Sequence, residues 1–281
     1  MNMSEIPEIF VVATPIGNLG DMTFRGIEIL KNADFILAED TRRTRTLLTH
    51  FEIGSKELIA YHDHAEEKKS SQIVDRLVSE NLKCALVSDA GTPCISDPGY
   101  RLIHEARQRG VKVTPVPGAC AFAALWSVCG LRHEKVVFCG FLPTKRKALE
   151  DEVSSWSAVR GTFAFYESPN RIQKTLAVIK ENFPYATVCV GRELTKLHEN
   201  YYYGSIDEVT SALEKEPNLK GEVVAMVDLH DAQMEEFDQQ GLEQKIKQAV
   251  EEGMSSREIL ELLNTPQLKK KELYQLIQKY K

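Results

Sequence analysis

The sequence predicts an α/β protein with two α/β domains and a small helical unit at the C-terminal end. Short, apolar, β-branched runs alternate with longer helical patterns as far as about residue 227. Two prolines, Pro115 and Pro117, interrupt this alternation, and the last forty or so residues have helical spacing only. A chain of 281 residues is long enough to bury two separate cores.

The first domain is predicted to span residues 1–114. It opens with an apolar strand at residues 9–13, which runs into a glycine-containing loop at residues 14–21. Thr23 is placed to cap the helix that follows. The remaining predicted elements are a strand at 35–38, a helix at 70–79, a strand at 84–88, a helix at 100–109 and a strand at 111–114. Strand, helix and strand in this succession indicate a parallel sheet.

The second domain is predicted to span residues 115–230. Its elements are a helix at 119–128, a strand at 136–139, a helix from about 145, a strand at 162–166, a helix at 171–181, and strands at 186–190 and 222–227. Acidic residues and glutamines at 231–240 indicate a linker. The final unit, residues 241–281, has helical spacing at 242–250, 255–263 and 269–280.

The charge balance argues against a protein that covers nucleic acid with positive surface. Lys and Arg number 35 and Asp and Glu number 41, for a net charge of −6. Contact with RNA would therefore depend on local basic clusters such as residues 42–45, 145–147 and 269–271, although each cluster taken singly favours an interpretation as solvated surface.

Membrane and metal sites are not expected. No apolar run approaches the ~18 residues of a membrane helix, and the first residues lack the pattern of a signal peptide, so a cytoplasmic location is predicted. The six cysteines form no C-x-x-C pair, which favours reduced thiols and gives no zinc-site spacing.

The densest turn sequence lies at residues 88–99, S-D-A-G-T-P-C-I-S-D-P-G, directly between a predicted strand and a helix. In a parallel sheet this position is the carboxyl edge, where ligands bind. Gly91 and Gly99 permit close approach of backbone, and the prolines stiffen the loop. The loop is neither a P-loop nor a G-x-G-x-x-G turn.

Six motifs together resemble one known family. They are T-P-I-G-N-L-G-D (14–21), A-E-D-T-R-R-T (38–44), S-D-A-G-T-P-C-I-S-D-P-G-Y-R (88–101), G-F-L-P-T-K (140–145), F-Y-E-S-P-N-R (165–171) and R-E-L-T-K (192–196). In this order they resemble the ribosomal RNA small subunit methyltransferase I family, within the tetrapyrrole methylase superfamily of S-adenosylmethionine (SAM)-dependent enzymes.

The resemblance implies the two-domain tetrapyrrole methylase fold, also called the class III SAM methyltransferase fold, with SAM between the domains. It implies a homodimer that methylates the ribose 2′-oxygen of a decoding-site cytidine in 16S rRNA of the small ribosomal subunit. The cofactor-binding positions that it implies are Pro15, Ala90, Gly91, Thr92, Ile95, Cys120, Ala121 and Tyr166. Thr92 stands where tetrapyrrole methylases carry Asp, and Cys120 replaces a hydroxyl residue, which weakens any hydrogen bond there.

The chemistry requires alignment of a ribose hydroxyl with the methyl group and help with the hydroxyl proton. Glu167 and Lys145 are the preferred catalytic pair, with Asp40 and Glu193 as further candidates. Glu39 and Arg192 belong to the same motifs, and all of these residues could instead form structural ion pairs. His62 and His64 could contact RNA. The residues expected to bind RNA phosphates are Arg42, Arg43, Arg45, Arg146 and Arg171.

Two other functions stay open. One is a methylase of a small molecule or tetrapyrrole from the same superfamily. Three features argue against it, namely the A-E-D-T-R-R-T motif, the F-Y-E-S-P motif and Thr92. The other is a non-catalytic ribosome-assembly factor that keeps the fold, which SAM binding and turnover would exclude.

Overall fold

The structure is a computed structural model that describes residues 6–62, 66–216, 219–230, 239–263 and 270–281. The chain divides into two compact units. Unit 1 comprises Met1–Gly130, Gly191–Tyr201 and Gly221–Val224, and unit 2 comprises Leu131–Val190, Tyr202–Lys220 and Ala225–Lys281. Each unit is described by itself.

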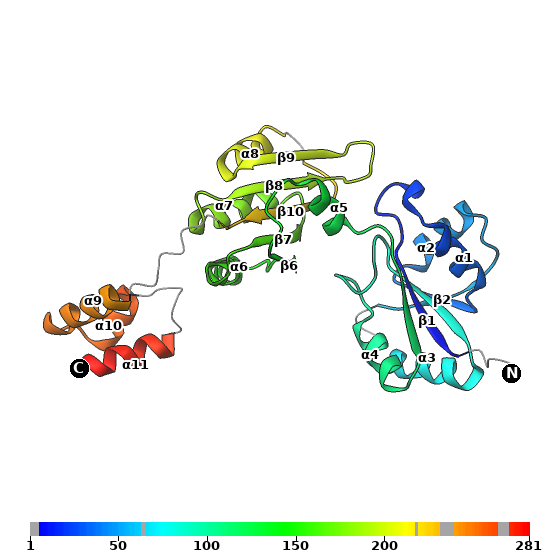
Figure 1. The fold of residues 1–281 in the computed structure, drawn as a ribbon, viewed down its shortest axis with the longest axis horizontal. Helices are drawn as coiled ribbons and strands as arrows, with labels where there is room; N and C mark the ends of the chain where they lie inside the picture. The colour runs from blue at the N-terminus through cyan, green and yellow to red at the C-terminus, as the bar shows by residue number, and fades with distance from the viewer. Residues whose placement is uncertain (1–5, 63–65, 217–218, 231–238, 264–269) are drawn as a thin grey trace. The chain divides into compact units, whose positions relative to one another are not determined.

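Unit 1 is built on a parallel sheet (Figure 1). Within the described ranges its strands are β1 (Glu8–Val12), β2 (Phe35–Ala38), β3 (Glu57–Ala60), β4 (Lys83–Val87) and β5 (Lys112–Val116), in the order β3-β2-β4-β1-β5. All four neighbouring pairs are parallel. The helices are α1 (Phe24–Asn32), α2 (Thr41–His50), α3 (Glu66–Glu80), α4 (Tyr100–Gln108) and α5 (Ala121–Val128), and η1 (Leu19–Asp21) is a 3-10 turn.

Helices cover both faces of this sheet, so apolar residues predominate in its central strands β1, β2 and β4. On one face Phe35 and Leu37 pack in a cluster with residues of α3 and α4, such as Leu77 and Leu102. On the other face Ile36 and Ala38 pack with residues of α1 and α2. Because side chains alternate along a strand, the four residues of β2 divide evenly between the two cores.

Unit 2 contains a second sheet, with the strand order β6-β7-β10-β8-β9 among the described residues. Its strands are β6 (Val136–Phe141), β7 (Thr162–Glu167), β8 (Thr187–Arg192), β9 (Asn200–Ser205) and β10 (Val223–Asp228). The ends of β8, β9 and β10 reach into segments assigned to unit 1. The helices are α6 (Arg146–Ser155), α7 (Ile172–Asn182) and α8 (Ile206–Glu214), and η3 (Trp156–Ala158) follows α6.

The C-terminal part of unit 2 folds into α9 (Gln239–Glu251), α10 (Ser256–Leu262) and α11 (Lys270–Tyr280). These helices share a small core of their own that includes Ile246, Ile259 and Ile277. At the start of α10 the Ser255 side chain and Glu258 form a capping box. The helical prediction for residues 241–281 agrees with these helices, while the predicted linker lies almost entirely outside the described residues.

Four elements escaped the sequence prediction, namely α2, β3, β9 and α8. The predicted end of the first domain at residue 114 also differs from the structure, in which the compact unit continues to Gly130. The prediction took Pro115 and Pro117 as the connection between two domains, but Pro115 lies within strand β5. A proline is tolerated there since β5 is the edge strand of its sheet.

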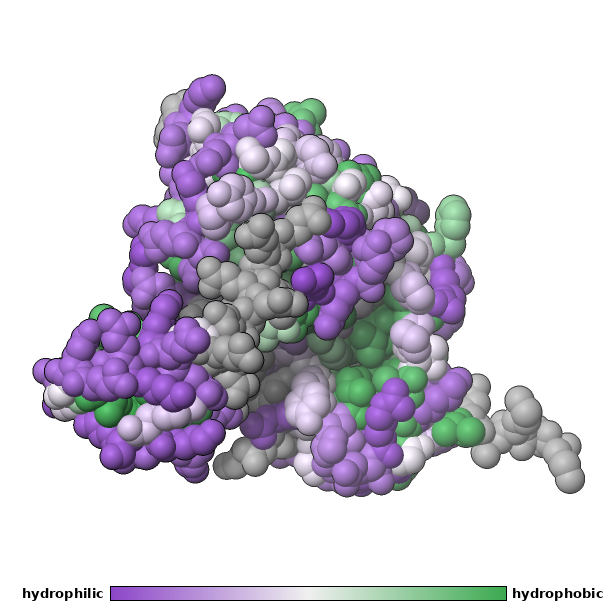
Figure 2. All heavy atoms as spheres, turned by 60° about the vertical axis from the view of Figure 1, so that its left-hand side comes forward, coloured by the Kyte–Doolittle hydropathy of each residue, from purple (hydrophilic) through white to green (hydrophobic). Residues whose placement is uncertain are grey.

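The face drawn in Figure 2 is mostly hydrophilic, and the apolar residues on it gather in patches. Within the described residues, no helix combines the length and the apolar character needed to cross a membrane.

Candidate functional site

The loop after β4 is fastened to the loop after β1. Thr14 and Gly91 form an isolated antiparallel bridge, with the Thr14 N–H donating to the Gly91 carbonyl at 2.8 Å and the Gly91 N–H donating to the Thr14 carbonyl at 3.0 Å. The buried Thr14 hydroxyl also donates to the Ser88 carbonyl at 3.2 Å. The carboxyl ends of two adjacent parallel strands, β1 and β4, therefore present one joined surface.

Gly91 adopts a conformation that other residues avoid. Its φ is +84°, and a Cβ added there would lie 3.3 Å from Ile16 Cγ2 and 3.7 Å from the Ala119 carbonyl oxygen. A residue with a side chain at this position would have a strained backbone, and its Cβ would press against Ile16. The sequence-based interpretation of this loop as one that allows close backbone approach agrees with this geometry.

A third segment, after β5, faces the same loop. The Thr92 hydroxyl donates to the Ala119 carbonyl at 3.0 Å. Cys120 then begins α5 as its N-cap without a side-chain hydrogen bond to the helix. Pro15, Ala90, Gly91, Thr92, Cys120 and Ala121 thus belong to three loops at neighbouring strand ends of unit 1.

The end of β2 is tied to the end of β4 by two carboxylates. Glu39 accepts a hydrogen bond from the Asp89 N–H at 3.2 Å, and Asp89 accepts one from the Asp40 N–H at 3.0 Å. Asp89 also pairs with Arg43 at 3.3 Å. The His62 Nδ1 lies 2.9 Å from the Glu39 carbonyl oxygen, whereas His64 lies outside the described residues.

Asp40 is the N-cap of α2. Its carboxylate accepts the Arg42 N–H at 2.8 Å and two further bonds from the Arg42 guanidinium at 3.1 and 2.7 Å. These hydrogen bonds, with the charge of Arg42, hold the pKa of Asp40 well below its usual range. A carboxylate with so low a pKa is a weak proton acceptor, so the geometry favours a helix-capping role.

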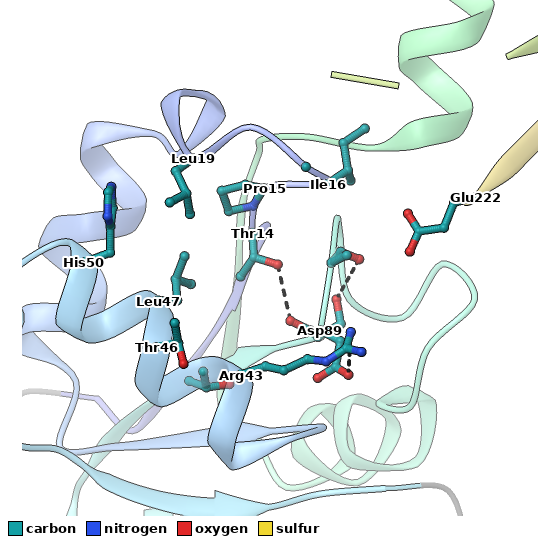
Figure 3. A pocket seen from close by; sticks show the side chains of 14 residues that line it. Thr14, Pro15, Ile16, Leu19, Arg43, Thr46, Leu47, His50, Asp89 and Glu222 are labelled. Carbon is teal, nitrogen blue, oxygen red and sulfur yellow. Dashed lines mark hydrogen bonds and ion pairs between the residues drawn. The ribbon is translucent and has the colours of Figure 1, made fainter. Parts of the chain in front are cut away.

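A pocket of about 360 Å³ opens beside α2 (Figure 3). One wall is the face of α2 that carries Arg43, Thr46, Leu47 and His50. The other walls come from residues 14–19, residues 88–90 and Glu222. All the lining residues belong to unit 1.

A brace involving Glu193 supports one side of this pocket. The Glu193 carboxylate accepts hydrogen bonds from Lys196 Nζ at 2.8 Å and from the Glu222 N–H at 2.9 Å, and Lys196 also pairs with Glu222 at 3.1 Å. Burial alone would raise the pKa of Glu193, but the bonds from Lys196 and Glu222 lower it overall. Lys196 packs so closely on Gly17 that an added Cβ there would overlap its side chain.

Glu193 and Thr195 both have positive φ, of 52° and 67°. Neither is a glycine, so this brace segment is held in a costly conformation by its contacts. One such contact is the bond from the Asn18 N–H to the Thr195 hydroxyl at 3.1 Å, which fastens the segment to the loop after β1.

In unit 2, Glu167 is buried, with 3% of its surface exposed. Its oxygens accept hydrogen bonds from the Ser168 N–H at 2.8 Å and the Thr175 hydroxyl at 2.7 Å, and Arg171 lies 3.3 Å away. Arg171 in turn donates to the carbonyls of Leu142 and Pro143 at 3.2 and 2.7 Å. Glu167 therefore orients Arg171, which holds the turn that leads to the exposed Lys145 at the start of α6.

The arginines expected to bind RNA differ in their surroundings. Arg42 and Arg43 pair with acidic neighbours but keep 86% and 68% of their side chains exposed, and Arg45 is exposed. Arg146 pairs with Glu150 and Glu181. Arg171 contacts Glu167 and the carbonyls of Leu142 and Pro143 through Nη2 and keeps only 27% of its side chain exposed, and its role as a phosphate ligand stays a prediction.

The remaining predicted cofactor positions are Ile95 and Tyr166. Ile95 is 46% exposed in the loop after β4. Tyr166 lies in β7, with ring contacts to Phe138 at 5.1 Å and Phe141 at 5.5 Å between centroids. A search of the described residues finds no group of three or more potential metal ligands.

Comparison with known proteins decides the family. Residues 8–210 match the model of Tetrapyrrole (Corrin/Porphyrin) Methylases. A Vibrio cholerae protein named Ribosomal RNA small subunit methyltransferase I is 45% identical over 223 residues, which cover 79% of this chain and 77% of that protein. Proteins of the same name from Escherichia coli O157:H7 and Halalkalibacterium halodurans are 41% and 42% identical, over 82% and 78% of this chain and 80% and 75% of theirs.

The chain belongs to the ribosomal RNA small subunit methyltransferase I family of tetrapyrrole methylases.

Solved structures of tetrapyrrole methylase relatives show the same fold. A diphthine synthase matches with a TM-score of 0.60 at 12% identity, over 82% of this chain and 95% of its own. A Thermus thermophilus uroporphyrin-III C-methyl transferase complexed with S-adenyl homocysteine matches with a TM-score of 0.53 at 14% identity, over 80% of this chain and 99% of its own. At such identities the likeness concerns the fold alone.

Sequence reasoning about this methylase missed the α2 wall of the pocket and the Lys196–Glu222 pair. The wall had little signal in the sequence, because only Leu47 among residues 43, 46, 47 and 50 is apolar. The pairing of Lys196 with Glu222 had none, since these residues are far apart in the chain.

Proposed function

We propose that this protein transfers a methyl group from SAM to the 2′-oxygen of a decoding-site cytidine in 16S rRNA of the small ribosomal subunit. The observation that carries the proposal is the similarity, at 41–45% identity over most of both chains, to proteins named Ribosomal RNA small subunit methyltransferase I. The cytidine and its ribose position come from the resemblance of the six motifs.

The loops of unit 1 fit a polar ligand such as SAM. Gly91 leaves space that a Cβ would fill, and the start of α5 has no side-chain cap from Cys120. We assign Pro15, Ala90, Gly91, Thr92, Ile95, Cys120 and Ala121 to SAM in this unit, and Tyr166 in unit 2. When bound, SAM supplies an electrophilic methyl group on a sulfonium sulfur.

In the transfer, the ribose oxygen forms a bond to the methyl carbon as the carbon–sulfur bond breaks, the sulfur leaves as a neutral thioether, and the hydroxyl proton passes to solvent water. The protein's main contribution is alignment of the reacting atoms, a term of up to ~7–11 kcal/mol for well-oriented reactants. Lys145 is the residue we assign to stabilising the negative charge that develops on the ribose oxygen. Glu167 positions Lys145 through Arg171. Asp40 caps α2, and Glu193 fixes Lys196 and Glu222 on another side of the pocket.

We also propose a cytoplasmic homodimer. The resemblance implies the dimer, and α5 supports it by exposing 38% of Trp126 and 59% of Val128. Analytical ultracentrifugation of the purified chain checks the assembly state.

The test of the function is to incubate the protein with labelled SAM and either assembled small subunits or naked 16S rRNA, and to map the modified nucleotide. Label on one ribose of the decoding site confirms the proposal. Label on a base contradicts the ribose assignment. SAM binding without transfer to either RNA substrate supports a small-molecule methylase, and absence of SAM binding supports an assembly factor.

A further inference from the structure

The pocket beside α2 lies at the strand ends next to the segments assigned to SAM. In the sheet order β3-β2-β4-β1-β5, the SAM segments follow β4, β1 and β5, whereas α2 follows β2. The pocket and the SAM segments meet at Pro15 and Ala90, which belong to both. The Ser88–Thr92 loop therefore contributes both to this pocket and to the segments assigned to SAM.

We propose that the α2 pocket receives the target nucleoside of the RNA, unstacked from its neighbours. This inference rests on the proposed function and names the place where its substrate binds. Because the ribose oxygen must approach the methyl carbon from the side opposite the sulfur, the acceptor needs its own recess next to that of the donor. The shared residues Pro15 and Ala90 provide this adjacency.

The walls of the pocket suit a nucleobase. Pro15, Ile16 and Leu47 offer apolar surface for the flat face of a base. Thr46 and His50 carry polar groups that can meet the hydrogen-bonding edge of the base (Figure 3). Recognition of single RNA nucleotides typically combines these two kinds of contact on a base that has left its stack.

The size of the pocket favours one nucleoside. Its volume of about 360 Å³ is near the lower end of the range of about 300–1,000 Å³ for small-molecule sites. A pyrimidine nucleoside is a small ligand on this scale, whereas a tetrapyrrole macrocycle is a large one. The pocket thus suits the RNA substrate better than the tetrapyrrole of the alternative function.

Arg43 supplies a cation at the rim of the pocket. Its guanidinium lies 3.3 Å from the Asp89 carboxylate and is 68% exposed. A guanidinium has five N–H donors, so one ion pair leaves donors for a phosphate beside the unstacked nucleoside. Asp89 meanwhile keeps the arginine side chain directed along the rim (Figure 3).

Two threonines of α2 allow a matched test. Thr46 and Thr49 are both exposed, and both donate their hydroxyl to the carbonyl four residues earlier, Arg42 at 3.2 Å and Arg45 at 2.9 Å. Only Thr46 lines the pocket. Thr46→Trp would fill the pocket with an indole ring, whereas Thr49→Trp adds the same ring to the same helix outside it.

Both variants and the wild type are compared in single-turnover methylation of small subunits, in calorimetric titration with SAM and in thermal unfolding. We expect Thr46→Trp to methylate about 100-fold more slowly, the loss that a misplaced substrate causes, with SAM affinity and unfolding midpoint like those of Thr49→Trp. Thr49→Trp is expected to match the wild type in all three measurements.

Each other result has a distinct meaning. Methylation by Thr46→Trp at the wild-type rate would overturn the nucleoside pocket and leave the proposed function intact. Loss of SAM affinity in Thr46→Trp alone would assign the pocket to the methyl donor and also overturn the inference. Failure of the wild type to methylate any small-subunit RNA would instead refute the proposed function. If Thr46→Trp unfolds at a lower temperature than Thr49→Trp, Thr46→Phe replaces it in the same comparison.

Discussion

The carboxylate of Glu39 accepts a hydrogen bond from the backbone N–H of Asp89 at 3.2 Å, which ties the end of β2 to the end of β4. Asp89 completes the connection by accepting the Asp40 N–H at 3.0 Å, at the start of α2. Glu39 and Asp89 thus act as acceptors for backbone N–H groups. They fix the position of α2, which carries one wall of the pocket.

Asp89→Ala is expected to lower the free energy of unfolding by about 1 kcal/mol, the usual net value of a hydrogen bond, because the Asp40 N–H loses its acceptor. Asp89→Asn retains an acceptor oxygen and should lose less. Urea unfolding monitored by circular dichroism measures both values. Equal losses in the two variants would show that Asp89 stabilises the fold mainly through its ion pair with Arg43, and not through the bond from the Asp40 N–H.

Gly91→Ala is expected to reduce both stability and SAM affinity. A residue with a Cβ at positive φ costs ~1–2 kcal/mol, and here the Cβ would also press on Ile16. Calorimetry with SAM and denaturant unfolding provide the two measurements.

Gly110 is the matched control for this change. Its φ is +71°, but an added Cβ would have no neighbour within 4 Å. Gly110→Ala should therefore show the cost in stability with unchanged SAM affinity. If both variants bind SAM like the wild type, Gly91 does not belong to the SAM site.

Glu167→Gln and Lys145→Met should separate positioning from catalysis. Glu167→Gln deprives the partly buried Arg171 of its charged partner, so we expect a loss of about 1–3 kcal/mol in stability, with the single-turnover rate of the folded enzyme nearly preserved. Lys145→Met should keep its stability, since Lys145 is exposed, and lose roughly 10- to 100-fold in rate. A 100-fold slower but equally stable Glu167→Gln enzyme would restore Glu167 as a catalytic residue.

Replacement of Arg42, Arg43 and Arg45 by Ala should weaken RNA binding and reduce its dependence on salt. With three exposed cations removed, the magnitude of the slope of log affinity against log salt concentration should fall by about 2 to 3. Fluorescence anisotropy with labelled RNA at several salt concentrations measures this slope. Lys31→Ala, on the exposed surface of α1, is the control and should leave the slope unchanged.

The ion pair between Arg132 and Asp228 should make stability depend on acid pH. Burial alone would raise the pKa of Asp228, but hydrogen bonds from Arg132 and His230 lower it below its ordinary value of 3.8. A carboxylate with a lowered pKa stabilises the fold above that ordinary value, and the contribution is lost as the pH falls through the pKa of the folded state. Arg132→Gln should therefore cost about 1–2 kcal/mol at pH 7.

The cost of Arg132→Gln should shrink when the pH falls below about 4, because the wild type then loses the same interaction. Urea unfolding of both proteins between pH 7 and pH 3 follows the difference. A difference that stays constant over this range would show that Arg132 stabilises the protein through packing instead of through the charge of Asp228.

Most strands of the two sheets were predictable because they are short apolar runs, whereas β3 and β9 were missed. Phe35–Ala38 is apolar at every position, as a strand covered on both faces must be. The position of the Ser88–Gly99 loop at a strand end was also predictable, because an apolar strand precedes it and a helix follows. The helix α2 was missed since only Thr44 and Leu48 of its ten residues are buried, which leaves little apolar pattern to read.

Sequence by itself determined the fold class, the family and the loops that meet at the strand ends, since these depend on local periodicity and on the order of motifs. Tertiary structure alone decided what each charged residue does. Glu167, Asp40 and Glu193 are equivalent carboxylates in a sequence, but the fold buries the first against Arg171, makes the second a helix cap and clamps the third to Lys196. The physical reason is that a carboxylate's role follows from its partners and its exposure to water, and these come from segments distant in the chain.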